Sequence, residues 1–168
     1  MRVRHELPAD DQAIHDLTFK AFAPMSFSNG SEAPIVRALR VAGDLTLSLV
    51  AEDEGTLVGH VAFSPVTVDG RHDGWFGLGP ISVHPDRQRR GIGRLLIERG
   101  LDMLREKGAK GCALIGNPAI YGRLGFESDG LLTYRGLPAR DVQYIVLAGT
   151  KPRGELRFAP ALEVDEPH

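Results

Sequence analysis

The chain has 168 residues, a formal net charge of −2 and a single cysteine, Cys112, and 42% of its residues are hydrophobic. This length and composition predict one domain over residues 1–168 with a buried core, and they exclude an internal disulfide. The near-neutral charge argues against nucleic acid or an anionic membrane as a partner, and no apolar run reaches the length of a membrane span. Because the N-terminus also lacks a signal-peptide core, we expect a cytoplasmic protein.

The first part of the chain predicts a short strand and two helices. The elements in order are a strand over residues 3–6, a helix over 10–23, a loop over 24–30 and a helix over 31–41. Pro8 ends the strand, Asp10 or Asp11 can cap the first helix, and Ser31 can cap the second. The two helices would form a lid over a substrate cleft or simply cover the sheet.

Three strands follow the helices. They are expected over residues 45–52, 56–68 and 75–84, with polar turns between them. Since short turns connect them, we expect an antiparallel meander. Pro65 indicates a bulge, a bend or a local edge in the second strand, and Pro80, with glycines at 77 and 79, weakens pairing in the third.

The second half of the chain predicts a long helix and further strands. The elements are a helix over 91–107, a strand over 111–116, a short helix over 118–124, strands beginning at Phe126 and over 142–148, an edge strand or packed tail over 154–158 and a loose end over 163–168. Ile97, Leu101 and Leu104 share one face of the long helix. A strand, helix, strand order implies a parallel pair. The chain therefore predicts an α/β fold with a mixed, mostly antiparallel sheet and flanking helices.

The loop over residues 88–94 carries the strongest functional signal. Gly91 and Gly93 lie where the long helix begins, and the first turn of a helix has unpaired N–H groups and the positive end of the dipole. Glycines allow an anion to approach that backbone, and Arg89 and Arg90 add positive charge. The pattern favours a phosphate or pyrophosphate site over an ordinary helix start with a solvated basic face.

Several other chemistries are not supported. The loop lacks the Gly-Lys-Ser/Thr of a Walker motif, and Leu96 stands where a dinucleotide fingerprint has its third glycine. The six histidines have no spacing typical of metal ligands, so we expect no metal. No Gly-x-Ser-x-Gly occurs, and Cys112 in an apolar run predicts a packed side chain rather than a catalytic thiol.

Two motifs, in this order, resemble the GNAT superfamily of N-acetyltransferases. Residues 83–93, Val-His-Pro-Asp-Arg-Gln-Arg-Arg-Gly-Ile-Gly, are similar to that family's acyl-CoA loop. Residues 121–126, Tyr-Gly-Arg-Leu-Gly-Phe, are similar to its Tyr-x-x-x-Gly-Phe motif. Within the superfamily, residues 77–83 and 116–121 look most like a predicted bacterial branch with poorly defined substrates.

The resemblance implies a GNAT-like fold that transfers acetyl from acetyl-CoA to a primary amine by direct attack. The strand containing Pro80 would part from the next strand, and its exposed backbone would bind the pantetheine arm. Tyr121 would be the general acid towards the departing thiolate, and the N–H of Ile81 would polarise the thioester carbonyl. The implied cofactor-binding residues are Ile81, Ser82, Val83, Gln88, Arg89, Arg90, Gly91, Ile92, Gly93, Arg94 and Asn117.

Other roles stay open for several of these residues. Tyr121 could instead be a core tyrosine, and Asn117 could be a turn former ahead of a proline. The general base is not identified, because the strand that would carry it lacks a clear glutamate. His84, Glu32 and Glu52 are the candidates.

Other functions and partners also stay open. A CoA-binding sensor without turnover, an enzyme with a longer acyl donor and a phosphate-binding module for nucleotides are the alternatives. The acceptor is either a small-molecule amine or a protein amino group. Sheet edges near the C-terminus are compatible with a homodimer.

Overall fold

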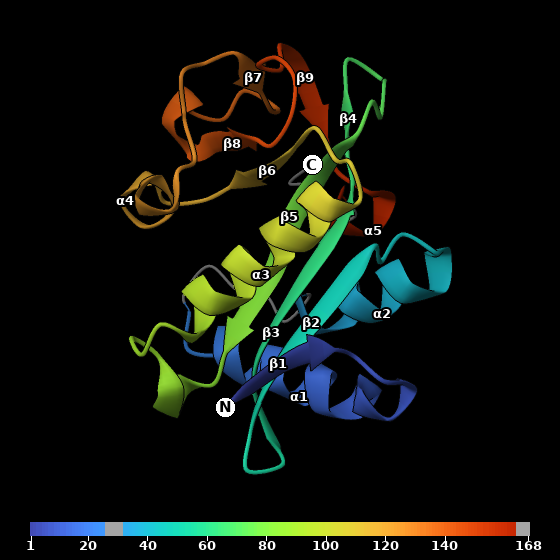
Figure 1. Cartoon of the computed structure of the whole chain (residues 1–168), viewed down its shortest axis with the longest axis vertical. Coiled ribbons are helices and arrows are strands. Elements are labelled where there is room, and N and C mark those ends of the chain that lie inside the picture. Colours follow the sequence, from blue (N-terminus) through green and yellow to red (C-terminus); the bar gives the residue numbers. More distant parts are fainter. Residues whose placement is uncertain (26–31, 164–168) are drawn as a thin grey trace.

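The computed structural model describes residues 1–25 and 32–163 (Figure 1). The strands are β1 (Arg2–His5), β2 (Leu47–Asp53), β3 (Thr56–Pro65), β4 (Thr67–Val68), β5 (Trp75–Val83), β6 (Gly111–Ile115), β7 (Leu132–Thr133), β8 (Val142–Val146) and β9 (Gly154–Arg157). The α-helices are α1 (Asp11–Phe22), α2 (Glu32–Ala42), α3 (Ile92–Glu106), α4 (Pro118–Tyr121) and α5 (Pro160–Glu163). Short 3-10 turns are η1 (Pro8–Asp10), η2 (Pro85–Arg87), η3 (Gly122–Leu124) and η4 (Ala139–Asp141). The expected cap Ser31 and residues 164–168 of the expected loose end lie outside the described residues.

The main sheet has the strand order β1-β2-β3-β5-β6-β8. Every neighbouring pair is antiparallel except β5 and β6, which α3 connects. The antiparallel meander and the parallel pair are therefore as the sequence predicted. A smaller sheet with the order β4-β9-β7 lies beyond the end of the main one at which β5 begins (Figure 1).

The two faces of the main sheet are covered by different helices. Phe63 of β3 packs in one cluster with residues of α3, whereas its neighbour Ala62 packs with Leu39 of α2. Successive side chains of a strand point to opposite faces, so α3 covers one face and α2 covers the other. Ile14 of α1 packs with α2 and with Val50 of β2, which places α1 on the α2 side.

The contact between α3 and β3 leaves no room for a side chain at one point. A Cβ on Gly100 would lie 2.2 Å from Cε1 of Phe63. Glycine at this position lets the helix approach the aromatic ring directly. The helix is thereby held close to the sheet.

Four expectations about elements were wrong. Phe126 does not begin a strand, because only an isolated bridge joins Glu127 to Tyr144 and the Phe126 ring packs into the core. Residues 154–157 form the central strand of the small sheet rather than an edge. Glu163 is not loose, since it ends α5 and pairs with Arg135 at 2.7 Å. Asp10 is the N-cap residue of α1, but its carboxylate binds Arg4 and does not cap the helix.

Candidate active site

The strands β5 and β6 pair over three residues each and then part. The register partners are Trp75 with Gly111, Phe76 with Cys112 and Gly77 with Ala113. β5 continues to Val83 while paired with β3 on its other side, and there Gly79 and Pro80 stand opposite the single residue Ala62. Two residues opposite one is a β-bulge, which bends the strand. The result is a V-shaped gap between β5 and β6, as the sequence predicted.

The backbone of β5 is open towards this gap. The N–H of His84 donates to the carbonyl of Val58 at 2.8 Å, so the backbone of even-numbered residues here faces β3. Main-chain groups alternate in direction along a strand. The groups of Ile81 and Val83 therefore face the gap, where Gln88 Nε2 donates to the Val83 carbonyl at 3.3 Å.

The N-terminus of α3 lies against the same strand. Gly91 is the N-cap residue with φ of 80°, and no side chain caps the helix. A Cβ on Gly93 would lie 3.7 Å from the side chains of both Ile81 and Val83. The unpaired N–H groups of the first turn are thus next to the open edge of β5, where an anion would be stabilised.

The arginines of the loop divide into two kinds. Arg87 pairs with Asp53 at 2.6 Å, and Arg94 pairs with Glu98 at 2.6 Å. Arg89 and Arg90 are exposed and bind none of the described residues. The two cations without a partner therefore flank the first turn of α3. Arg89 is also held at φ of 66°, a backbone conformation uncommon for a side chain of this kind.

Tyr121 lies at the other side of the gap, where β6 ends. A Cβ on Gly116 would lie 2.6 Å from Cε2 of Tyr121, and the tyrosine ring packs edge-on against Phe126. Burial raises the pKa of the Tyr121 phenol. Its hydroxyl binds none of the described residues, in contrast to the satisfied hydroxyl expected of a core tyrosine.

Asn117 has a structural role at the start of α4. Its side-chain oxygen accepts a hydrogen bond from the N–H of Ala119 at 2.9 Å, which caps the helix. The turn-forming role that the sequence left open is therefore present. The cap fixes the start of α4, the short helix that ends at Tyr121.

The three candidates for a general base stand apart from the gap or are already engaged. His84 Nδ1 accepts from the N–H of Asp86 at 3.1 Å and so caps the turn η2. Glu52 lies on β2, which β3 separates from β5, and it pairs with Arg4 at 3.4 Å. Glu32 lies in the first turn of α2. β5 itself carries no acidic residue.

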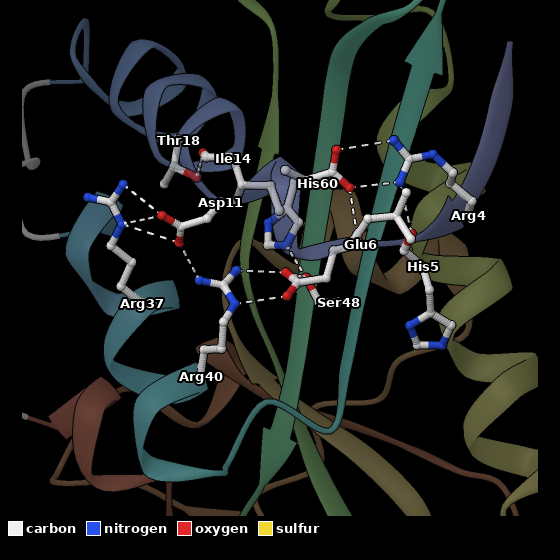
Figure 2. A network of polar contacts seen from close by, with 12 residues as sticks. Arg4, His5, Glu6, Asp11, Ile14, Thr18, Arg37, Arg40, Ser48 and His60 are labelled. Atoms are coloured by element: carbon white, nitrogen blue, oxygen red, sulfur yellow. Dashed lines mark hydrogen bonds and ion pairs between the residues drawn. The ribbon is translucent and has the colours of Figure 1, made fainter.

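The structure also holds a partly buried polar network that the sequence did not predict (Figure 2). Ser48 donates to the carboxylate of Glu6, and Ser48 Oγ lies 2.8 Å from Nε2 of His60. Arg40 binds the same carboxylate through two hydrogen bonds, of 2.8 and 2.7 Å. These residues are far apart in sequence, so no local motif predicts the network.

Over residues 1–25 and 32–163, no three His, Cys, Asp or Glu side chains gather closely enough to hold a metal ion. In the same residues, no helix has the length and apolar character needed to cross a bilayer.

Comparison with known proteins defines the class. A family model described as the acetyltransferase (GNAT) family matches residues 13–126, which include the gap, the loop and Tyr121. The chain therefore belongs to the GNAT family and is an N-acetyltransferase by descent. The mixed sheet with a splayed strand pair is the fold that the sequence predicted for this family.

Individual proteins of the GNAT family are similar to this chain over most of its length. The chain is 42% identical over 128 residues to the uncharacterized N-acetyltransferase YhbS of Escherichia coli K12, covering 76% of this chain and 74% of YhbS. A GNAT family acetyltransferase from Brucella melitensis, solved in complex with acetyl-CoA, is similar with a TM-score of 0.86 and 43% identity, covering 96% of this chain and 97% of that one. Escherichia coli YhbS in complex with CoA gives a TM-score of 0.89 at 33% identity, covering 98% and 93%.

Proposed function

We propose that the chain moves the acetyl group of acetyl-CoA to a primary amine, which attacks the thioester carbonyl directly. The observation that carries the proposal is the placement of the helix N-terminus beside an open strand edge. The first turn of α3 would bind the pyrophosphate, with Arg89 and Arg90 as additional cations. The main chain of Ile81 and Val83 would bind the pantetheine arm as an added strand.

Within this proposal, Tyr121 is the general acid. The thiolate of CoA leaves as the amide forms, and a phenol is a suitable proton donor to a thiolate. The unpartnered hydroxyl at the end of β6 supports this role, because a donor already bonded elsewhere would have to break that bond first. The N–H of Ile81, which faces the gap, would stabilise the negative charge that develops on the carbonyl oxygen.

The test is release of free thiol from acetyl-CoA in the presence of primary amines. A useful panel contains a polyamine, several amino acids, an aminoglycoside and a short peptide with a free N-terminus. We expect thiol release that depends on both the enzyme and at least one amine, with a product of mass increased by one acetyl group. Calorimetric titration with CoA and with ATP should show binding of CoA only.

One observation favours a second function. Because β5 carries no carboxylate, the site lacks the base expected there, and the chain could be a CoA-binding sensor without turnover. Saturable binding of acetyl-CoA with no thiol release for any amine would support the sensor and contradict the proposed transferase. Binding of ATP as tight as that of CoA would contradict both.

A further inference from the structure

The buried network of Glu6, Ser48 and His60 fixes which nitrogen of the histidine carries the proton (Figure 2). Burial raises the pKa of Glu6, but hydrogen bonds from Arg40 and Ser48 outweigh it and lower that pKa, so Glu6 is ionised and can only accept. Ser48 therefore donates its single hydroxyl hydrogen to Glu6, so its oxygen must accept a hydrogen bond from the Nε2–H of His60. In a neutral imidazole the other nitrogen, Nδ1, then holds a lone pair.

His60 Nδ1 and a buried hydroxyl on the neighbouring strand both lack a partner among the described residues, and we call the region between these two polar atoms the polar space. No described group hydrogen bonds to His60 Nδ1, and the same is true of Ser82 Oγ. The two residues are register partners on β3 and β5, so their Cα atoms are about 5.5 Å apart and their side chains share one face of the sheet. Ser64 Oγ, two positions after Ala62 on the same face of β3, is also buried without a partner. Buried polar atoms of this kind ordinarily bind an internal water, so we expect one between His60 and Ser82.

This polar space is adjacent to the strand that borders the gap. Ser82 lies between Ile81 and Val83, whose main-chain groups face the gap. The proposed phosphate site is on the α3 face, so we place the acceptor amine on the other face, which α1 and α2 cover. His60 and Ser82 are on that other face, because Ala62 of β3 packs there against α2.

We propose that His60 accepts the proton of the acceptor amine through an internal water, and that Ser48 and Glu6 are the residues that position it. This inference rests on the proposed function. The acceptor R–NH₃⁺ gives one proton to the water while the water gives one to His60 Nδ1, leaving a neutral amine, water and an imidazolium. The Nε2–H stays bonded to Ser48, and the Glu6 carboxylate stabilises the imidazolium across that hydroxyl. The imidazolium returns its proton to solvent through water after the products leave.

The charges around the ring suit a base that rests in its neutral form. Burial is the largest influence and lowers the pKa of His60 to about 4, Glu6 raises it, and Arg40 from α2 lowers it. β2 and β5 present only uncharged hydroxyls to the ring. The charges that act on the ring are those of Glu6 and Arg40, and Arg40 is also bonded to Asp11 of α1 at 2.6 Å. The ring is therefore neutral at pH 7, with Nδ1 available.

The first test compares Ser48→Ala with Thr18→Val. Ser48→Ala removes the link between His60 and Glu6, whereas Thr18→Val removes a buried hydroxyl that bonds only to the carbonyl of Ile14 in its own helix. With the primary amine that gives the fastest thiol release, we expect Ser48→Ala to lower kcat about 10- to 100-fold at pH 7, with KM for acetyl-CoA unchanged. The deficit should shrink to about threefold or less at pH 10, where much of the amine is already unprotonated.

His60→Gln should show the same pH pattern, and Thr18→Val should match the wild-type protein at both pH values. A defect that was only structural would lower the rate equally at pH 7 and pH 10. A wild-type rate for Ser48→Ala at pH 7 would overturn the relay while leaving the transferase intact. A wild-type protein that binds acetyl-CoA but releases no thiol would instead overturn the proposed function, and the relay with it.

A second test does not depend on activity. The ¹⁵N spectrum of the histidine side chains, with His60 assigned by its loss in His60→Gln, reports the tautomer directly. We expect a neutral ring protonated on Nε2 at pH 7. A ring protonated on Nδ1 would overturn the inference whatever the turnover.

Discussion

At the scale of single residues, Tyr121 combines a packed ring with a hydroxyl that has no protein partner. Gly116 and Phe126 hold the ring, so the position of the hydroxyl does not depend on a hydrogen bond of its own. Burial raises the pKa of the phenol, so it keeps its proton at neutral and mildly alkaline pH. These are the properties that a proton donor to a thiolate needs.

Replacing Tyr121 with Phe therefore tests chemistry rather than packing. We expect Tyr121→Phe to lower kcat about 10- to 100-fold while the Kd for acetyl-CoA changes less than about twofold, because the ring contacts are kept. Thiol release and calorimetry measure the two quantities. Tyr144→Phe is the matched control, since its hydroxyl donates to Asp129 at 2.5 Å. It should lose about 1 kcal/mol of stability but no kcat. An unchanged kcat for Tyr121→Phe would remove the acid role.

A low pKa does not prevent His60 from taking a proton during turnover. Moving a proton from an alkylamine, with a pKa of about 10.4, to a group with a pKa of about 4 costs about 9 kcal/mol. Typical turnover of 1–10³ per second corresponds to barriers of about 13–17 kcal/mol. A transient imidazolium therefore lies below the barrier of an ordinary enzyme.

Residues of the site differ in how far the sequence could predict them. The loop glycines and Tyr121 lie in two short stretches, and the family resemblance identified both. Glu6, Ser48 and His60 come from three separate segments, and only the register of β2 against β3 brings the last two together. A single sequence holds no signal for such a pairing, so the sequence left the base unidentified and offered only His84, Glu32 and Glu52 as candidates.

At the scale of elements, the N-terminus of α3 is the feature on which the proposed cofactor binding depends. The two glycines that flank this helix offer a matched comparison. Gly91 precedes it and Gly108 follows it, both have φ of 80°, and a Cβ would meet nothing within 4 Å at either position. An added side chain thus meets the same left-handed backbone in both places, but only Gly91 is beside the proposed phosphate site.

We expect Gly91→Ala and Gly108→Ala each to cost about 1 kcal/mol of stability, because L side chains disfavour that conformation. Only Gly91→Ala should also weaken acetyl-CoA binding, by about tenfold, because its methyl group approaches the phosphates. Urea unfolding and calorimetric titration provide the two measurements. Equal Kd values for the two variants would show that the first turn of α3 does not hold the cofactor.

The long elements were predictable, whereas the very short β7 and α5 were not. The periodicity of α3 and the alternation of β2, β3 and β5 are strong over many residues, so their bounds were nearly correct. β7 has two residues and α5 has four, too few for any period to show. α5 is instead held by tertiary contacts such as the bond from Tyr134 to Glu163 at 2.6 Å.

At the scale of the whole molecule, the sheet separates two regions of different chemistry. The α3 face carries the helix N-terminus and the exposed arginines, which suit a phosphorylated cofactor. The α1 and α2 face carries the buried chain from Arg40 to His60 (Figure 2). β5 borders both, because its edge faces the gap and its Ser82 side chain faces the polar space. The donor and the proton acceptor would thus meet at one strand from opposite sides.

The buried histidine also makes the stability of the whole fold depend on pH. The folded pKa of His60, about 4, lies below its ordinary value of 6.5, so the unfolded chain binds more protons between these two pH values. The contribution of His60 to stability is therefore complete above pH 6.5 and is lost as the pH falls towards 4. Between pH 7.5 and pH 5 we expect the free energy of unfolding to fall by about 2 kcal/mol more in the wild-type protein than in His60→Gln. Urea unfolding at both pH values measures the difference, and equal losses in the two proteins would mean that His60 is not buried in its neutral form.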